Sequence, residues 1–192
     1  MNNIKYIFSS SLTSYRSSYK NSLFGYGWAI IHPLLLLVIY SVVFSTIMQS
    51  RVSPNMDISY TVYLSVCILP WIVFSTAVSQ GTLGISGNIH LIKKLSIPLY
   101  VYVTKEVLQQ FFNMAVVLML LVGFLFFNNI HFSIKWLSIL VPLILLFFFA
   151  LGLSMFLAAI NIFFRDIEKA IGILLQILMW IVPIVYPWDI VP

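Results

Sequence analysis

Residues 81–98 read GTLGISGNIHLIKKLSIP and separate two long apolar runs, residues 60–79 and 107–127. Within this stretch a glycine recurs at every third position. Glycine weakens a helix, so we expect these residues to loosen the end of the first apolar helix. They are Gly81, Gly84 and Gly87. The stretch therefore predicts a turn between two membrane-length segments.

A short basic helix is predicted after the glycines. Asn88 belongs to the residue types favoured at helix N-caps. Lys93 and Lys94 would place positive charge in the last turn, where the helix dipole favours it. Pro98 ends the unit, because proline disfavours helical geometry at the residue before it. Such a unit is either a plain cytoplasmic turn or a docking site for a soluble partner.

The composition indicates an integral membrane protein. The 192 residues are 61% hydrophobic and 8% charged, and a soluble domain needs more polar surface than this. The mean hydropathy is +1.05. The net charge is +5, but the basic residues stand singly or in pairs at the ends of apolar runs, which excludes a nucleic-acid-binding stripe. The single cysteine, Cys67, excludes an internal disulfide and a multi-cysteine metal site.

Residues 4–24 are predicted to form an amphipathic helix in the headgroup layer of the membrane. Apolar and aromatic residues recur there at steps of three and four, and basic residues occupy other positions. Tyr15, Arg16 and Tyr19 belong to this interfacial segment. The alternative is a cytoplasmic tail whose sequence happens to be periodic.

Five apolar segments are predicted to cross the bilayer as helices, since a helix rises ~1.5 Å per residue and the hydrocarbon is ~30 Å thick. They are residues 26–48, 60–79, 107–127, 136–164 and 170–186. Pro70 interrupts the second segment as a packing kink or a functional hinge. The fourth segment carries a stripe of small residues that permits close approach of a helix from the same chain or from a second copy. These are Ala150, Ser154 and Ala158.

The basic residues predict a cytoplasmic N-terminus. In that orientation eight of them lie inside and two outside, as the excess of positive charge in cytoplasmic loops requires. The inside set is Lys5, Arg16, Lys20, Lys93, Lys94, Lys105, Arg165 and Lys169, and the outside set is Arg51 and Lys135.

The chain lacks the residues that several functional classes need. No charged residue lies in the central part of a predicted span, which argues against proton-coupled transport. No P-loop motif is present, so energy for transport would come from a partner. The enzyme hypothesis, a membrane-embedded glycan transferase or polymerase, would need His90 and residues 165–169 to meet in one polar site.

Several stretches together resemble the permease subunits of type-2 ABC exporters. The closest branch exports polysaccharide, namely the O-antigen of lipopolysaccharide, capsule and teichoic acid. The resemblance is carried by YRSSYKNSLFGYGW at residues 15–28 with His32-Pro33, LPW at 69–71, NIHLIKK at 88–94 with Pro98, FFRD at 163–166 and VPIVYP at 182–187. A drug or lipid exporter of the same superfamily is the nearer alternative.

The resemblance implies roles for particular residues. Residues 81–98 would be the coupling helix that docks on the ATPase subunit, and the interfacial helix would also approach that subunit. The coupling residues would be Asn88, His90, Lys93, Lys94 and Pro98. Arg165 and Asp166 would close the second cytoplasmic turn, and Trp71 and Phe74 would line the path of the glycan or, alternatively, face lipid or core.

The resemblance also implies an assembly. Two permease chains and two ABC ATPase chains would form a multi-pass transporter for lipid-linked polysaccharide in the cell membrane, which is the inner membrane in a Gram-negative source. The permease would have no catalytic residues and bind no cofactor, since the partner uses the ATP. The family has six spans, so a chain that ends after the fifth is expected to be C-terminally truncated.

Overall fold

The structure is a computed structural model, and it describes residues 3–18, 24–43, 60–95, 97–127 and 138–185. Within those ranges all regular elements are helical, which confirms the all-α membrane class. The α-helices are α1 (Asn3–Ser18), α2 (Trp28–Val42), α3 (Tyr60–Thr82), α4 (Ile89–Ile92), α5 (Leu99–Phe127), α6 (Leu140–Phe163) and α7 (Ile167–Ile181). Two 3₁₀ turns, η1 (Gly25–Gly27) and η3 (Ser86–Asn88), precede α2 and α4.

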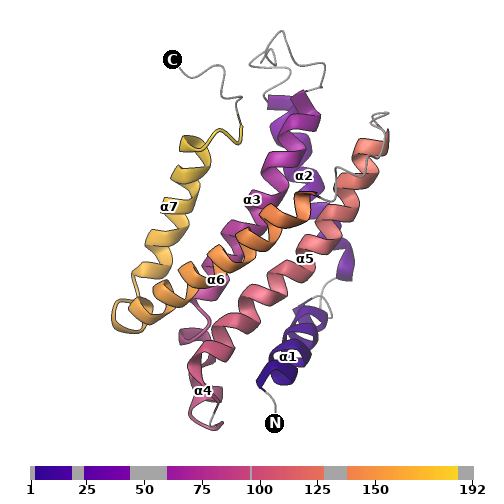
Figure 1. Cartoon of the computed structure of the whole chain (residues 1–192). Coiled ribbons are helices and arrows are strands. Elements are labelled where there is room, and N and C mark those ends of the chain that lie inside the picture. Colours follow the sequence, from indigo (N-terminus) through magenta and orange to yellow (C-terminus); the bar gives the residue numbers. More distant parts are fainter. Residues whose placement is uncertain (1–2, 19–23, 44–59, 96, 128–137, 186–192) are drawn as a thin grey trace.

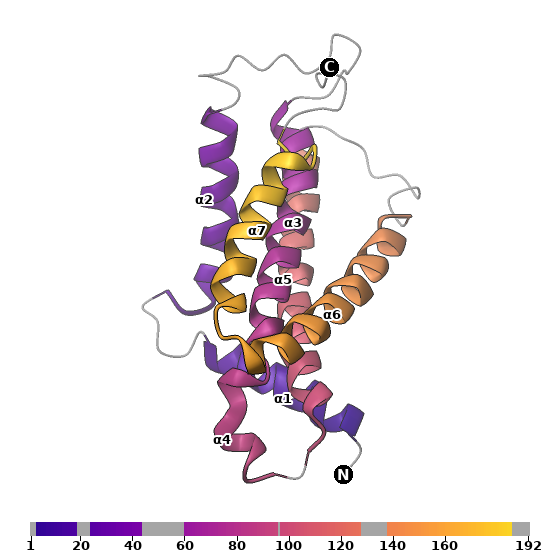
Figure 2. The same ribbon diagram turned by 90° about the vertical axis from the view of Figure 1, so that its left-hand side faces the viewer.

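Helix α3 is the centre of the bundle. It contacts α2, α5, α6 and α7, while α1 packs on α5. Helix α6 crosses the others obliquely, and α2 and α7 lie on the outside (Figures 1 and 2). Helix α1, helix α4 and the turn from α6 to α7 all lie at one end of the bundle, which we call the α4 end (Figure 1).

Three helices are long and apolar enough to cross a membrane, so the chain is a multi-pass membrane protein. They are Val62–Thr82, Leu99–Phe126 and Leu140–Phe163. Helices α2 and α7 have 15 residues each in the described part of the chain. A 15-residue helix is about 22 Å long, shorter than the hydrocarbon layer. The count of five spans therefore stays a prediction for these two segments.

The helix boundaries differ from the predicted ones at several ends. Helix α1 is described as far as Ser18, residues 19–23 of the predicted segment lie outside the described residues, and η1 precedes α2. Helix α5 begins at Leu99, directly after Pro98, and runs through Lys105 and Glu106, which form an ion pair of 3.0 Å. Helix α7 ends before Val182, whose extended backbone (ψ 137°) is the geometry favoured before a proline.

The small-residue stripe of α6 packs within the chain. Ala150, Ser154 and Ala158 are buried, and the Ser154 hydroxyl donates to the Ala77 carbonyl of α3 at 3.4 Å. Of the two alternatives that the sequence left open, the structure shows packing against a helix of the same chain. Helices α3 and α6 are thus closely packed just before the chain enters residues 81–98.

Candidate functional site

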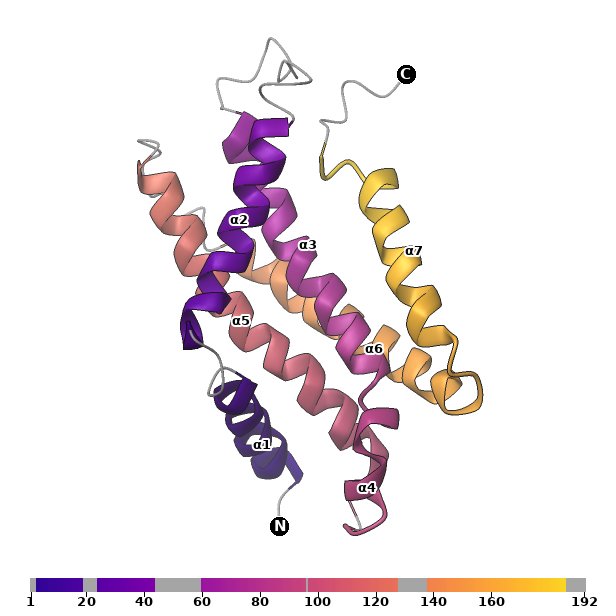
Figure 3. The ribbon, with the colours of Figure 1, turned by 180° about the vertical axis from the view of Figure 1, so that it is seen from behind.

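Residues 81–95 divide into a buried root and an exposed tip. In the root, residues 81–88, Gly81, Thr82 and Gly84 are buried among α3, α5 and α6. The tip, residues 89–95, comprises α4 and the turn after it and forms the far point of the α4 end (Figure 3). Its apolar side chains Ile89, Leu91 and Leu95 are 39%, 45% and 40% exposed, and the predicted coupling residues His90, Lys93 and Lys94 are exposed beside them.

Two of the three glycines of the root permit close helix packing. A Cβ atom on Gly81 would lie 2.5 Å from the Ser154 Cβ, and one on Gly84 would lie 2.8 Å from the Val103 Cα. A Cβ atom on Gly87 would meet nothing within 4 Å. None of the three has positive φ. Helix α3 ends at Thr82, between Gly81 and Gly84, as the glycines predicted. These two glycines also allow α5 and α6 to come close, which was not predicted.

Asn88 holds the root by a different bond from the one predicted. It occupies the N-cap position of α4, but its side chain makes no cap hydrogen bond. Its Nδ2 donates to the Gly84 carbonyl at 2.8 Å and, at 3.5 Å, to Glu106 Oε1 on α5. The N-cap position is as predicted, but the side-chain amide bonds the Gly84 carbonyl and Glu106 and does not cap α4. Glu106, in turn, pairs with Lys105.

Asn161 connects the root to α6 and was not among the residues predicted for the site. The residue is 2% exposed, and its Nδ2 lies 3.3 Å from the Ser86 hydroxyl and 3.5 Å from the Thr82 carbonyl. Its Oδ1 is buried without a hydrogen-bond partner in the described part of the chain. A lone amide inside the apolar run 136–164 was the available signal, because buried polar groups in a membrane helix need partners.

Replacing Asn161 by aspartate is expected to destabilise the protein by about 3 kcal/mol, because a buried carboxylate would face the Thr82 carbonyl without a counter-charge. Asn161→Leu is the matched control. It removes two long hydrogen bonds together with the unpaired oxygen, so we expect a change within about 1 kcal/mol. Unfolding in detergent with increasing SDS measures both variants. Equal stability of the two variants would contradict this account of the site.

Helix α1 is fixed along α5 beside the root. The fully buried Ser11 hydroxyl lies 2.7 Å from the Ile7 carbonyl of its own helix and 3.1 Å from the Lys105 carbonyl of α5, and so it can donate to either. Phe8 and Tyr15 meet the ring of Phe112 edge-on, at 5.6 and 6.2 Å between centroids. Of the predicted interfacial residues, Tyr15 thus contacts α5 and Arg16 is exposed, while Tyr19 lies outside the described residues.

The turn between α6 and α7 carries Arg165 and Asp166, both exposed at the α4 end. The enzyme hypothesis required these residues to join His90 in one pocket. His90 lies on the tip instead, and none of the three lines either of the two grooves that flank α2. Among the described residues no group of three or more His, Cys, Asp or Glu could hold a metal ion.

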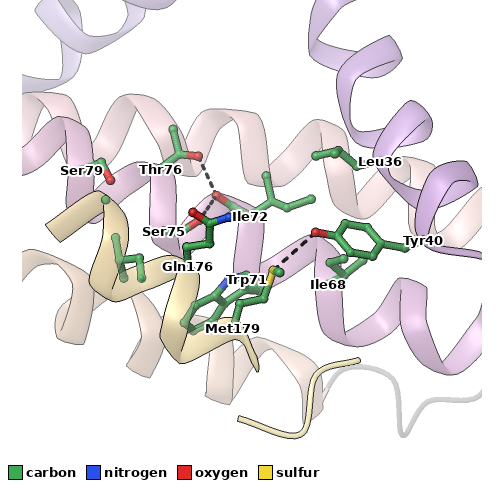
Figure 4. A pocket seen from close by; sticks show the side chains of 12 residues that line it. Leu36, Tyr40, Ile68, Trp71, Ile72, Ser75, Thr76, Ser79, Gln176 and Met179 are labelled. Carbon is green, nitrogen blue, oxygen red and sulfur yellow. Dashed lines mark hydrogen bonds between the residues drawn. The ribbon is translucent and has the colours of Figure 1, made fainter. Parts of the chain in front are cut away.

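Trp71 lines a groove of about 350 Å³ between α2, α3 and α7 (Figure 4). We call this the α2–α7 groove. Its wall mixes aromatic and hydrogen-bonding side chains, including Tyr40, Ser75, Thr76, Ser79 and Gln176. The Tyr40 hydroxyl donates to the sulfur of Met179 at 3.8 Å across the groove. Phe74 is 5% exposed and belongs to the hydrophobic core, where one face of its ring stacks on the exposed Phe149, and it does not line this groove.

Comparison with known proteins identifies relatives over most of the chain. The model of the ABC-2 type transporter family matches residues 6–192. An O-antigen export system permease protein, RfbA, from Klebsiella pneumoniae is 30% identical over 91% of this chain, and one from Myxococcus xanthus is 31% identical over 90%. The polysialic acid transport protein KpsM of Escherichia coli is 26% identical over 88%. The chain spans 66%, 64% and 64% of these three relatives.

Proposed function

This chain belongs to the ABC-2 type transporter family, and from that premise we propose that it is the membrane-spanning permease subunit of an ATP-driven exporter of lipid-linked polysaccharide. The observation that carries the proposal is the similarity, over about nine-tenths of the chain, to permeases named for O-antigen and polysialic acid transport. The subunit works as a dimer of two copies with two ABC ATPase chains and is not itself an enzyme.

The tip is the docking point for the ATPase in this proposal. Ile89, Leu91 and Leu95 expose apolar surface next to two lysines at the end of the bundle. Apolar anchors with a charged rim are typical of protein interfaces. The root supports the same role, because its packing on α5 and α6 would transmit a force applied at the tip into both helices.

The α4 end faces the cytoplasm in this proposal. Helix α1, the tip and the α6–α7 turn share that end, and each carries basic residues (Figure 1). The positive-inside rule assigns such an end to the cytoplasm. The N-terminus is then cytoplasmic, and ATP hydrolysis takes place on the side where ATP is available.

A polysaccharide is favoured over a drug or a lipid as the cargo. The path of an apolar cargo would be uniformly apolar, whereas the α2–α7 groove offers four hydroxyl side chains and the amide of Gln176 beside Trp71. Aromatic rings and neutral hydrogen-bonding groups suit sugar rings and hydroxyls. The position of Trp71 in this groove supports its proposed role on the glycan path, whereas Phe74 is buried in the hydrophobic core.

Complementation tests the function directly. The gene, with that of its ATPase, is expressed in bacteria that lack their own O-antigen export permease, and surface polysaccharide is measured by immunoblotting of intact cells. We expect export with the active ATPase and none with an ATPase whose nucleotide site is disabled. Export that is independent of the ATPase would overturn the proposal.

Replacing Trp71 by alanine is expected to lower export about ten-fold without unfolding the protein, because a stacking surface worth about 1.4 kcal/mol would be lost from a half-buried position. Trp71→Phe, which keeps a ring, should retain most of the export. The assay is surface polysaccharide per unit of permease. Equal export by Trp71→Ala and Trp71→Phe would show that Trp71 is not part of the glycan path.

A further inference from the structure

A second groove lies on the other side of α2, between α2, α3 and α5, and the proposed transport path does not use it. We call it the α2–α5 groove. Its volume is about 320 Å³. Its hydrogen-bonding side chains are Trp28, His32, Thr76, Gln110 and Asn113, and its lining contains no Lys, Arg, Asp or Glu.

The α2–α5 groove lies at the level of the interfacial helix. Phe8 and Tyr15 of α1 contact the ring of Phe112 on α5. Gln110 and Asn113, which line the groove, are close to Phe112 in sequence on the same helix. Helix α2 begins just beyond α1 (Figure 3). If α1 lies in the headgroup layer, as the proposed function requires, the mouth of this groove opens at the boundary between headgroups and hydrocarbon.

The groove presents both donors and acceptors. Pro33 lines it and has no N–H, so the carbonyl of Ala29, also in the lining, lacks its helical hydrogen bond. Asn113 Nδ2 donates to Gln110 Oε1 at 3.0 Å, which leaves Gln110 Nε2 as the donor of that side chain. Such groups are costly against hydrocarbon, so a polar occupant is favoured there.

The surface beyond the groove is apolar. Along α2, Leu34, Leu35, Val38 and Ile39 are between 41% and 54% exposed. A polar groove followed by an apolar strip matches the shape of a membrane lipid, with its headgroup in the groove and its acyl chains along α2. The lining has no formally charged residue, which favours a headgroup with no net charge.

We propose that the α2–α5 groove binds the headgroup of a zwitterionic phospholipid that carries a primary ammonium group, as phosphatidylethanolamine does. The phosphate accepts from His32 and from Gln110 Nε2, and the ammonium donates to the Ala29 carbonyl. A trimethylated ammonium has no N–H to donate, and an anionic headgroup would find no Lys or Arg. A volume of about 320 Å³ is sufficient for one such headgroup.

Lipid retention tests this proposal without ATPase or transport, so it can fail while the proposed function holds. The purified chain is equilibrated with vesicles of phosphatidylethanolamine, phosphatidylcholine or phosphatidylglycerol, re-extracted in mild detergent and analysed by native mass spectrometry. We expect one retained phosphatidylethanolamine and about ten-fold less of the other two lipids. Gln110→Leu and, separately, the exposed His32→Leu should each reduce retention about ten-fold.

Gln176→Leu is the matched control, because it makes the same change in the α2–α7 groove and should retain the lipid. Equal retention of the three lipids, or full retention by both Gln110→Leu and His32→Leu, would overturn the proposal. A further arm adds polyprenyl phosphate. Displacement of phosphatidylethanolamine at equimolar polyprenyl phosphate would show a site for the lipid carrier instead and would also overturn it.

Discussion

Gly81→Ala is expected to destabilise the protein by about 2–3 kcal/mol, although alanine is the better helix former. In an exposed helix the same change would stabilise by about 0.5–1 kcal/mol. Here the new methyl group would lie 2.5 Å from the Ser154 Cβ and 2.9 Å from the Val107 Cγ2. The Ser154 Cβ is fixed to its backbone, so α3 and α6 must separate, and overpacking of this kind costs about 1–3 kcal/mol.

Gly84→Ala should act in the same direction, because its methyl group would meet the backbone of Val103 on α5. Gly87→Ala is the matched control. It adds the same methyl group where nothing lies within 4 Å, and the backbone there does not have positive φ, so we expect no loss of stability. Thermal unfolding in detergent, followed by loss of monodisperse protein, ranks the three variants. If Gly81→Ala were as stable as Gly87→Ala, the close approach of α3 and α6 would be wrong.

Leu91→Asp is expected to weaken binding of the ATPase at least 30-fold while leaving the permease folded. Leu91 is 45% exposed on the tip, and in the proposed complex it fills an apolar pocket of the partner. Loss of one anchor of an interface costs about 2 kcal/mol or more, and a buried aspartate adds the cost of an unpaired charge. Replacing Lys93 and Lys94 by glutamate should weaken binding of the ATPase less, because these lysines lie at the rim of the proposed interface. Salt should reduce this effect.

Leu99→Asp is the control for this prediction. Leu99 is 46% exposed, but it is the first residue of α5, where the helix dipole favours a negative charge, and it lies outside the tip. Co-purification of the ATPase and its apparent Kd for permease in nanodiscs are the measurements. Equal loss of binding by Leu99→Asp and Leu91→Asp would show a general effect of charge and would contradict docking at the tip.

Hydropathy and turn residues predicted the all-helical class and the position of the unit at residues 81–98. These predictions succeeded because the bilayer alone requires apolar segments to alternate with basic turns, whichever helices pack against one another. The start of α5 was missed because the charges of Lys105 and Glu106 indicated the edge of the apolar segment, whereas the helix runs through both and they pair with each other. In such a case local charge is a poor guide to where a helix starts.

The contacts of the root could not be predicted from the sequence. The Asn88 amide bonds Glu106, 18 positions along the chain, and the Asn161 amide bonds Ser86, 75 positions away. Spacing within one helix carries no information about such partners. The same holds for Trp71 and Phe74, which are three residues apart on α3, yet one lines a groove and the other is buried against Phe149.

The central claim is that the tip faces the cytoplasm and is covered there by a soluble ATPase. Lys93→Cys, introduced with Cys67→Ala, places the only thiol of the chain on the tip for reaction with a membrane-impermeant maleimide. We predict no labelling in intact cells, rapid labelling in inside-out membrane vesicles stripped of the ATPase, and protection when the ATPase is added back. Labelling of the tip from outside intact cells would contradict the account.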